Sequence, residues 1–167
     1  MRVIAVMQPV WEFNRGRTLA LLDAVAAAPD PRRVLAWRPR PGRAHIGWQL
    51  MHVGVTEELF ASERLVGTPA SFAELVPRFR GGSTPDDDVP DVNLIREVLA
   101  ASRRHLLDTV GRFSESDLAV VPAALRERGW SVETVLRVLA WHEPHHQGQA
   151  HLTFNLWKAA QASSAGE

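Results

Sequence analysis

The chain has 167 residues, of which 46% are hydrophobic and 23% are charged. These proportions are typical of a folded protein with a substantial core, and they exclude a largely disordered chain. Basic and acidic residues number 19 each, which disfavours broad binding to nucleic acid, and the absence of cysteine excludes disulfides, thiolate ligands and a cysteine nucleophile.

The first periodic segment is followed by a proline-rich stretch. Apolar residues at helical spacing predict a helix over about 14–28, which the prolines directly after it bring to an end. The arginine-rich stretch 32–43 is interrupted by Pro39 and Pro41. We therefore interpret it as a linker rather than as a nucleic-acid-binding arm.

A second helix is predicted over about 44–65. At about 100° per residue, His52 shares one face of this helix with Trp48 and Thr56. That face is mainly apolar and is expected to point toward the core. His52 is unusual there, because an imidazole without a partner is costly to bury.

Three further helices are predicted after residue 70. Ser71 and Glu74 have the spacing of a capping box, which predicts a short helix over about 71–79. Two long periodic segments follow, over about 91–113 and about 131–160. Long runs of alternating apolar and polar residues are missing, so the sequence predicts an all-α protein.

The last predicted helix carries the most informative motif. His142 and His146 stand on consecutive turns of one helix face, close enough to chelate a single metal ion. His145 points about 100° away from His146 and is not expected to join them. Two imidazoles leave most of a metal's coordination sphere empty, so a third ligand must come from elsewhere. His52 is the candidate, because it lies on the inward face of the second helix.

A simpler interpretation of a buried histidine is a hydrogen bond to a backbone carbonyl or to a hydroxyl such as that of Thr56. For His52 taken alone this interpretation is favoured, and the inward pair in the last helix shifts the balance toward a metal. Of the other histidines, His45 is expected at the start of a helix, His105 at the edge of an apolar stripe and His151 on the surface.

The two histidine segments together resemble the DinB-like superfamily. The segment 46–53, IGWQLMHV, is followed about ninety residues later by the segment 141–149, WHEPHHQGQ, and the resemblance extends over about 44–157. It implies an antiparallel four-helix bundle, usually dimeric, in which one histidine of the second helix joins an H-x-x-x-H pair of the last helix. Transferred to this sequence, the implied ligands are His52, His142 and His146.

Three neutral imidazoles leave a divalent metal with much of its charge and with open positions, so that it can activate water or a thiol. Relatives in the DinB-like superfamily include enzymes that depend on low-molecular-weight thiols and others described as metal-dependent hydrolases. The resemblance therefore implies a hydrolase or an S-transferase that acts on a small-molecule substrate. Zinc and nickel are the expected metals, and any thiol must be external because the chain has no cysteine.

Four residues near the expected ligands are candidates for supporting roles. Glu143 could act as a general base or orient a ligand, and a surface salt bridge is the alternative. Gln49, Thr56 and Gln149 are candidate pocket residues that orient ligands or substrate.

The motif has one irregular feature and one rival interpretation. Pro144 lies between the paired histidines and predicts a local bend, because proline cannot donate a hydrogen bond to the Ala140 carbonyl.

His142, Glu143 and His146 also match the short H-E-x-x-H pattern of zinc proteases, with the glutamate as general base. This rival is disfavoured, because the longer pattern of one class of these proteases is not continued here.

We expect a single domain over 1–167, with the first helix and linker over 13–43, a metal-binding core over 44–162 and a tail over 163–167. No run of about 20 apolar residues is present, so we expect a cytoplasmic protein with neither membrane nor nucleic acid as a partner. The resemblance also implies a homodimer. The alternative to an enzyme is a bundle that the metal only stabilises, or one that binds a ligand without catalysis.

Overall fold

The computed structural model describes residues 3–164, and every regular element in that range is helical. This confirms the all-α prediction. The four long helices are α1 (Val3–Ala26), α3 (Ile46–Leu59), α5 (Val92–Val110) and α6 (Val132–Ser164). None of these helices combines the length and the apolar character that crossing a membrane requires.

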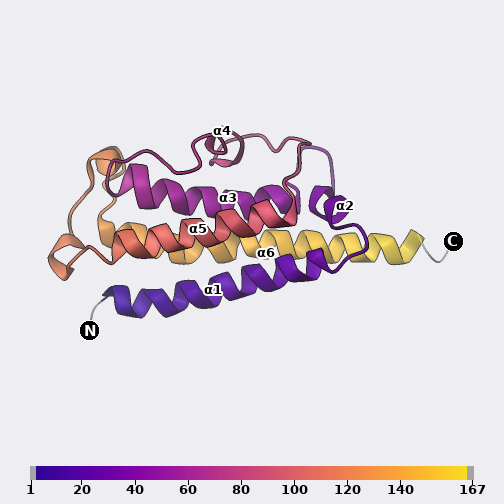
Figure 1. The fold of residues 1–167 in the computed structure, drawn as a ribbon, viewed down its shortest axis with the longest axis horizontal. Helices are drawn as coiled ribbons and strands as arrows, with labels where there is room; N and C mark the ends of the chain where they lie inside the picture. Colours follow the sequence, from indigo (N-terminus) through magenta and orange to yellow (C-terminus); the bar gives the residue numbers. More distant parts are fainter. Residues whose placement is uncertain (1–2, 165–167) are drawn as a thin grey trace.

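The long helices lie lengthwise beside one another (Figure 1). In that view α1 and α6 run from left to right, whereas α3 and α5 run from right to left. The chain between α3 and α5 returns along the outside, which allows both helices to run in the same direction. The connecting segments contain short helical elements: α2 (Pro31–Ala36), the π-helical turn η1 (Phe60–Arg64), α4 (Val76–Phe79), and the 3₁₀ turns η2 (Glu115–Asp117) and η3 (Ala123–Arg128).

Helix α3 is the central element, since every one of its residues is buried. It packs against α5 on one side and against α6 on another. Gly54 permits the close approach to α5, because a Cβ atom at this position would lie 2.8 Å from Cγ1 of Val98. His52 therefore lies in the middle of a helix that is surrounded by protein.

The first two helical elements differ from the prediction. Helix α1 begins at Val3, well before the expected start, and it contains Pro9. Trp11 is buried whereas Val6, Val10 and Phe13 are exposed, so apolar residues lie on both faces of this segment. The inward apolar residues therefore do not stand out as a helical stripe in the sequence.

Part of the expected linker is helical. Asp30 caps α2 by accepting a hydrogen bond from the backbone N–H of Arg33 at 3.0 Å, and Pro31 occupies the first turn. An aspartate followed by a proline is a recognised signal for the start of a helix. The connection over 32–43 therefore contains a short helix, which the sequence analysis did not predict.

The capping box expected at Ser71 and Glu74 is not the start of a helix. Residues 71–75 form turns, and the helical part is confined to α4. The backbone N–H of Ser71 donates instead to Oε1 of Glu58 in α3, at 2.7 Å. This tertiary hydrogen bond replaces the local one, which accounts for the difference.

Helix α6 continues through Pro144 without interruption. The Ala140 carbonyl, which Pro144 leaves without its helical donor, accepts a hydrogen bond of 3.1 Å from Nδ2 of Asn14 in α1. Of the expected tail, Ser163 and Ser164 still belong to α6, and 165–167 lie outside the described residues.

Candidate metal centre

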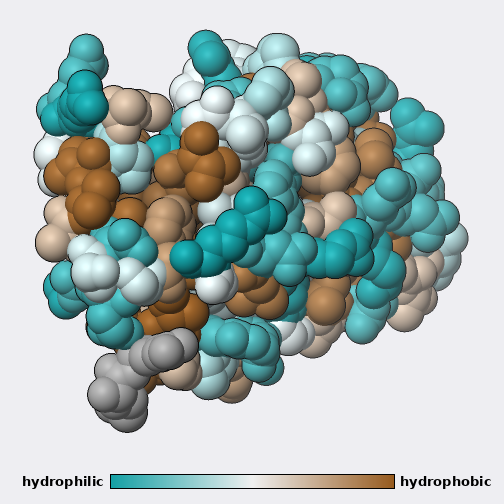
Figure 2. Space-filling view, turned by 60° about the vertical axis from the view of Figure 1, so that its left-hand side comes forward, coloured by the Kyte–Doolittle hydropathy of each residue, from teal (hydrophilic) through white to brown (hydrophobic). Residues whose placement is uncertain are grey.

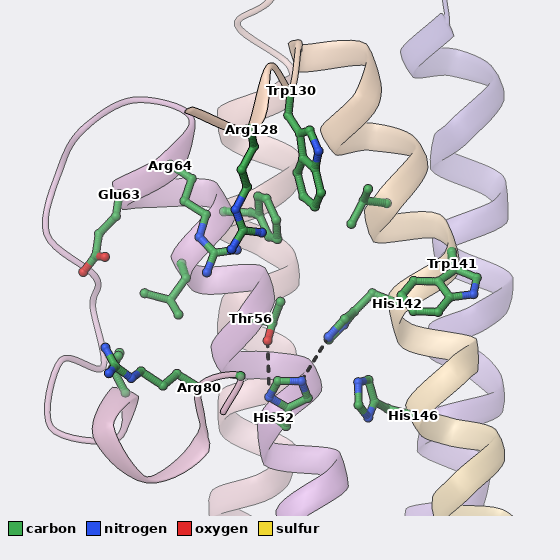
Figure 3. Close-up of a pocket in the computed structure, with 15 residues that line it drawn as sticks. His52, Thr56, Glu63, Arg64, Arg80, Arg128, Trp130, Trp141, His142 and His146 are labelled. Atoms are coloured by element: carbon green, nitrogen blue, oxygen red, sulfur yellow. Dashed lines mark hydrogen bonds between the residues drawn. The ribbon is translucent and has the colours of Figure 1, made fainter. Parts of the chain in front are cut away.

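The imidazoles of His52, His142 and His146 meet between α3 and α6 (Figure 3). One nitrogen atom from each ring lies within 4.8 Å of the other two. Nε2 of His52 and Nε2 of His142 are 3.1 Å apart. Two nitrogens that bind one tetrahedral ion at about 2 Å lie roughly 3.3 Å apart, so this separation suits a shared metal ion. The structure thus brings together the three expected ligands.

Helix α4 and Trp48 orient His52. The Phe79 carbonyl lies 2.6 Å from Nδ1 of His52, and a carbonyl can only accept, so Nδ1 carries the proton and Nε2 presents a lone pair. The Trp48 ring stacks on His52 with a centroid separation of 4.7 Å and an interplanar angle of 10°. Trp48 itself is held by a hydrogen bond of 3.0 Å from its Nε1 to the Arg78 carbonyl.

A chain of side-chain hydrogen bonds orients His146. Its Nδ1 lies 2.6 Å from Oε1 of Gln49, which acts as the acceptor and leaves Nε2 as the ligand atom. Nε2 of Gln49 then donates to Oε1 of Gln149 at 2.9 Å, and Nε2 of Gln149 donates to Nε2 of His145 at 2.8 Å. Gln49 and Gln149 would therefore act on a bound metal through His146. His145 is not part of the group of three, although its ring contacts that of His146 edge to face at a centroid separation of 5.0 Å.

All three imidazoles are in the form that binds a metal. Burial, together with the neighbouring imidazoles, lowers the pKa of His142 to about 2. Burial also lowers the pKa of His146 to about 3, again with a contribution from the adjacent rings. The pKa of His52 is lowered by burial, against the opposing effect of the Phe79 carbonyl. The rings are therefore neutral at physiological pH, as a divalent metal requires.

A cavity of about 490 Å³ opens beside the three rings. In the part of the chain that the structure describes, no fourth acid or imidazole joins the group, so an ion held there would keep positions open toward the cavity. The donor set and its geometry thus fit a divalent metal. The cavity lining includes Thr56, Arg64, Arg128, Trp130 and Trp141.

The candidate pocket residues are divided between two cavities. Thr56 lines the first cavity, and its Oγ1 lies 3.5 Å from Nδ1 of His52. Gln49 and Gln149 instead line a second cavity of about 500 Å³, which His146 also borders. The metal centre is therefore in contact with two separate spaces.

Glu143 does not face either cavity. Its Oε1 accepts hydrogen bonds from Nε of Arg15 and Oγ1 of Thr18, both at 2.7 Å, and its Oε2 accepts one of 2.5 Å from Arg103. Both arginines also form ion pairs with Glu57. We call Arg15, Glu57, Arg103 and Glu143 the ion cluster; it takes one residue from each long helix. The structure thus places Glu143 in a buried structural network rather than beside the metal ligands.

The remaining histidines lie where the sequence predicted them. His45 is the N-cap of α3, where its Nδ1 accepts a hydrogen bond of 3.0 Å from the backbone N–H of Trp48. His105 lies on α5 with its Nδ1 2.9 Å from Oε2 of Glu58, and His151 is exposed on α6.

Sequence reasoning missed the ion cluster and the cavity arginines. The motif analysis assigned no role to Arg64 and Arg128, because they lie in short turns that follow different long helices. Only the docking of those turns brings them to one cavity. The same holds for Arg15 and Arg103, which are single charges within otherwise helical patterns.

Comparison with known families gives one match. The family model described as the DinB superfamily matches residues 11–150, a range that contains all three histidines and most of α6. A search of curated proteins returned no match. The family match agrees with the resemblance carried by the segments around His52 and His142.

Proposed function

Because this chain belongs to the DinB superfamily, we propose that it is a metal-dependent enzyme that activates an external low-molecular-weight thiol for transfer to a small-molecule substrate. The observation that carries the proposal is the convergence of three neutral imidazole nitrogens at the edge of an open cavity. His52, His142 and His146 hold the divalent metal, with zinc and nickel as the expected ions.

A divalent metal held by neutral imidazoles retains its positive charge and can lower the pKa of a thiol to near neutrality. The protein's own groups fix the geometry. The Phe79 carbonyl and Gln49 hold the protons of His52 and His146 on the far side of each ring. Helix α3, which is buried throughout, keeps His52 from moving away from α6. Trp130 and Trp141 supply the apolar wall against which a substrate can pack.

Activation of a thiol is favoured over activation of water by the distribution of acidic residues. A water nucleophile usually needs a general base within hydrogen-bonding reach, whereas a thiol needs only to lose its proton. Among the described residues that line the cavity, Glu63 is the only acid, and it points away from the imidazoles (Figure 3). Glu143 is occupied in the ion cluster. A hydrolase that uses the same three histidines remains the second candidate from the family resemblance.

A zinc protease and a purely structural metal site receive less support from the geometry. A protease of the H-E-x-x-H type needs Glu143 beside the metal, and this carboxylate instead pairs with Arg15 and Arg103. A structural site is usually closed by four protein ligands, and here three ligands face a cavity. The arrangement of α1, α3, α5 and α6 supports a four-helix bundle in which α3 runs antiparallel to α6.

Metal analysis of protein purified without a nickel column tests the ligand set. We expect about one divalent ion per chain in the wild type and its loss in His146→Ala, because two imidazoles bind weakly. His151→Ala is the matched control, since His151 is exposed on the same helix outside the cluster. Full occupancy in His146→Ala would remove this residue from the proposed site.

A transfer assay tests the reaction class. Metal-loaded protein is incubated with an electrophilic acceptor and with a panel of small thiols, and the consumption of free thiol is measured with and without a chelator. We expect turnover that depends on both thiol and metal. Metal-dependent hydrolysis of ester or amide substrates without any thiol would instead support the hydrolase.

A further inference from the structure

Two arginines face the cavity beside the metal centre. Arg64 belongs to η1 and Arg128 to η3, and both line the same cavity as His52 and His142. Figure 3 shows their side chains reaching toward each other above Thr56. In the same view Arg80 extends away from the histidines.

Aromatic rings hold both guanidinium groups in place. Cζ of Arg64 lies 4.4 Å from the centroid of the Phe60 ring, and Cζ of Arg128 lies 5.1 Å from that of Trp130. The Phe60 and Trp130 rings are themselves nearly parallel, at 9°, with centroids 6.4 Å apart. Cation–π contacts of this kind fix the position of a guanidinium without neutralising its charge. The two positive groups are therefore positioned before any ligand binds.

Neither guanidinium forms an ion pair with an acid within residues 3–164. By contrast, Arg15 and Arg103 are matched by the two glutamates of the ion cluster, and Arg78 pairs with Asp86. Burial lowers the pKa of Arg64, and the nearby charge of Arg128 lowers it further, against a smaller opposing effect of the adjacent glutamate in η1. Both groups stay charged, because arginine does not lose its proton in proteins. The half-buried Arg64 and the exposed Arg128 thus place two positive charges, unpaired among the described residues, side by side at the cavity.

The arginines and the imidazoles border one space. His52, His142 and His146 line the same cavity of about 490 Å³ as Arg64 and Arg128. An anion bound at the arginines would therefore belong to a molecule that also faces the three imidazoles. Trp130 and Trp141 line the cavity as well and suit the apolar body of such a molecule.

We propose that Arg64 and Arg128 form an oxyanion-binding site that holds the terminal carboxylate or phosphate of the molecule reacting at the three-histidine centre. The planar guanidinium donors match the two oxygens of either group, and one oxyanion would offset the repulsion between the arginines. The identity of the neighbouring metal centre rests on the proposed function, whereas the oxyanion site rests on the arginines themselves. The substrate class is thus a small molecule with an anionic end and an apolar body.

The oxyanion site is tested first on metal-free protein. Inorganic phosphate and succinate are titrated separately at low salt, and the Nε–Hε resonances of Arg64 and Arg128 are followed by NMR. We expect saturable shifts with one or both anions and none with neutral succinamide. The tighter of the two anions identifies the headgroup as phosphate or carboxylate. Absence of saturable shifts with both anions would overturn the proposal, whatever the metal content of the protein.

Variants separate charge from geometry. Arg128→Gln alters an exposed position and should not affect folding. It is expected to lower the affinity for the anion by about tenfold. Arg64→Lys keeps the charge but loses the planar fork, and a smaller loss is expected. Arg126→Gln is the matched control, because Arg126 is exposed in η3 and does not line the cavity. Anion affinities equal to that of the wild type in all three variants would show that the anion binds elsewhere.

A second experiment tests the distance to the metal centre. Cobalt-loaded protein is titrated with mercapto-carboxylic acids of two to six carbons and with the mercapto-alcohols of the same lengths, and thiol binding is followed by the cobalt absorption spectrum. We expect at least one acid to bind about tenfold more tightly than its alcohol, and Arg128→Gln to remove that difference. Equal binding of every acid and its alcohol would overturn the link between the two sites. A failure of cobalt to bind would contradict the proposed function alone, since the metal-free titration still decides the oxyanion site.

Discussion

The hydrogen bond between His146 and Gln49 shows how one uncharged side chain can orient a candidate metal ligand. Oε1 of Gln49 holds the proton on Nδ1 of His146, which leaves the other nitrogen free to bind. Such outer partners of metal ligands fix both the tautomer and the orientation of the ring. Gln49 is therefore expected to matter for affinity although it does not itself contact the ion.

Gln49→Leu should lower metal affinity by about 10-fold to 100-fold, because His146 loses the acceptor that orients it. Gln49→Glu keeps an acceptor at the same position and should retain most of the affinity. Competition with a chromophoric chelator gives the dissociation constants. An unchanged constant in Gln49→Leu would mean that the hydrogen bond does not position the ligand.

At this scale the sequence indicates the ligands and names Gln49 as a residue that orients ligands or substrate, but it does not indicate the partners that other elements supply. The spacing of His142 and His146 determines that they share a helix face, so this pair could be recognised from the sequence alone. The Phe79 carbonyl and the arginines of the cavity could not, because their roles depend on how separate elements dock. Glu143 illustrates the same limit, since its partners come from α1 and α5.

The contact between α1 and α6 compensates for the proline inside α6. Asn14 supplies a donor to the Ala140 carbonyl, whose helical donor is removed by Pro144. A carbonyl left unpaired in this partly buried place would cost free energy. The effects of Asn14 and Pro144 on the free energy of unfolding should therefore be coupled.

We expect Asn14→Ala to lower the free energy of unfolding by about 1 kcal/mol in the wild type. In a Pro144→Ala background the helical N–H is restored, so the same substitution should cost clearly less. Urea denaturation of the wild type, the two single variants and the double variant measures this coupling. Identical costs in both backgrounds would contradict the compensation.

The ion cluster joins the four long helices through buried charges. Removing one charge from such a group leaves an arginine without full compensation, so Glu143→Gln should lower the free energy of unfolding by about 3 kcal/mol or more. Glu133→Gln on the same helix is the control, since its pair with Arg137 lies at the surface and should contribute less than about 1 kcal/mol. Both values come from urea denaturation.

The Glu143→Gln variant also separates two roles for this residue. Substitution of a structural residue should lower the free energy of unfolding. Substitution of a general base should instead lower turnover and leave the free energy of unfolding unchanged. Metal stoichiometry of the folded Glu143→Gln protein should stay near that of the wild type. An unchanged free energy of unfolding together with a loss of activity would mean that Glu143 takes part in the reaction.

The long helices that pack in the interior are the elements that sequence patterns predicted well. Helices α3, α5 and α6 lie close to their expected ranges; α5 carries a regular apolar stripe, whereas α3 is buried on all sides. The first part of α1 and the turns over 71–75 were missed, since exposed apolar residues and a tertiary hydrogen bond determine them. The local signal for α2 was present in Asp30 and Pro31 but was outweighed by the residues that follow.

The outer surface of the molecule carries apolar side chains on two neighbouring helices. Val6, Val10 and Phe13 lie near the start of α1, whereas Leu152 and Leu156 lie farther along the bundle, in the second half of α6. Figure 2 brings the left-hand end of Figure 1, where α1 begins, forward and shows brown hydrophobic patches among hydrophilic residues. We propose that the exposed apolar residues of α1 form the interface of a homodimer, the assembly that the family resemblance implies.

Phe13→Asp should shift the protein from dimer to monomer, because Phe13 is 71% exposed and contributes little to the core of a single chain. Light scattering coupled to gel filtration gives the mass of each species, and circular dichroism checks that the helix content is unchanged. Val120→Asp, at an exposed apolar position outside α1 and α6, is the control and should remain dimeric. A wild-type protein that is monomeric at high concentration would contradict the proposal.

His52 and His142 are separated by 90 positions in the chain, yet their nitrogens are 3.1 Å apart. An ion between them would act as a reversible cross-link that closes a long loop and holds the last helix onto the middle of the molecule. The supply of metal in the cell would then influence how long each copy survives before it unfolds and is degraded. Starvation for the ion would then lower the amount of folded protein in the cell.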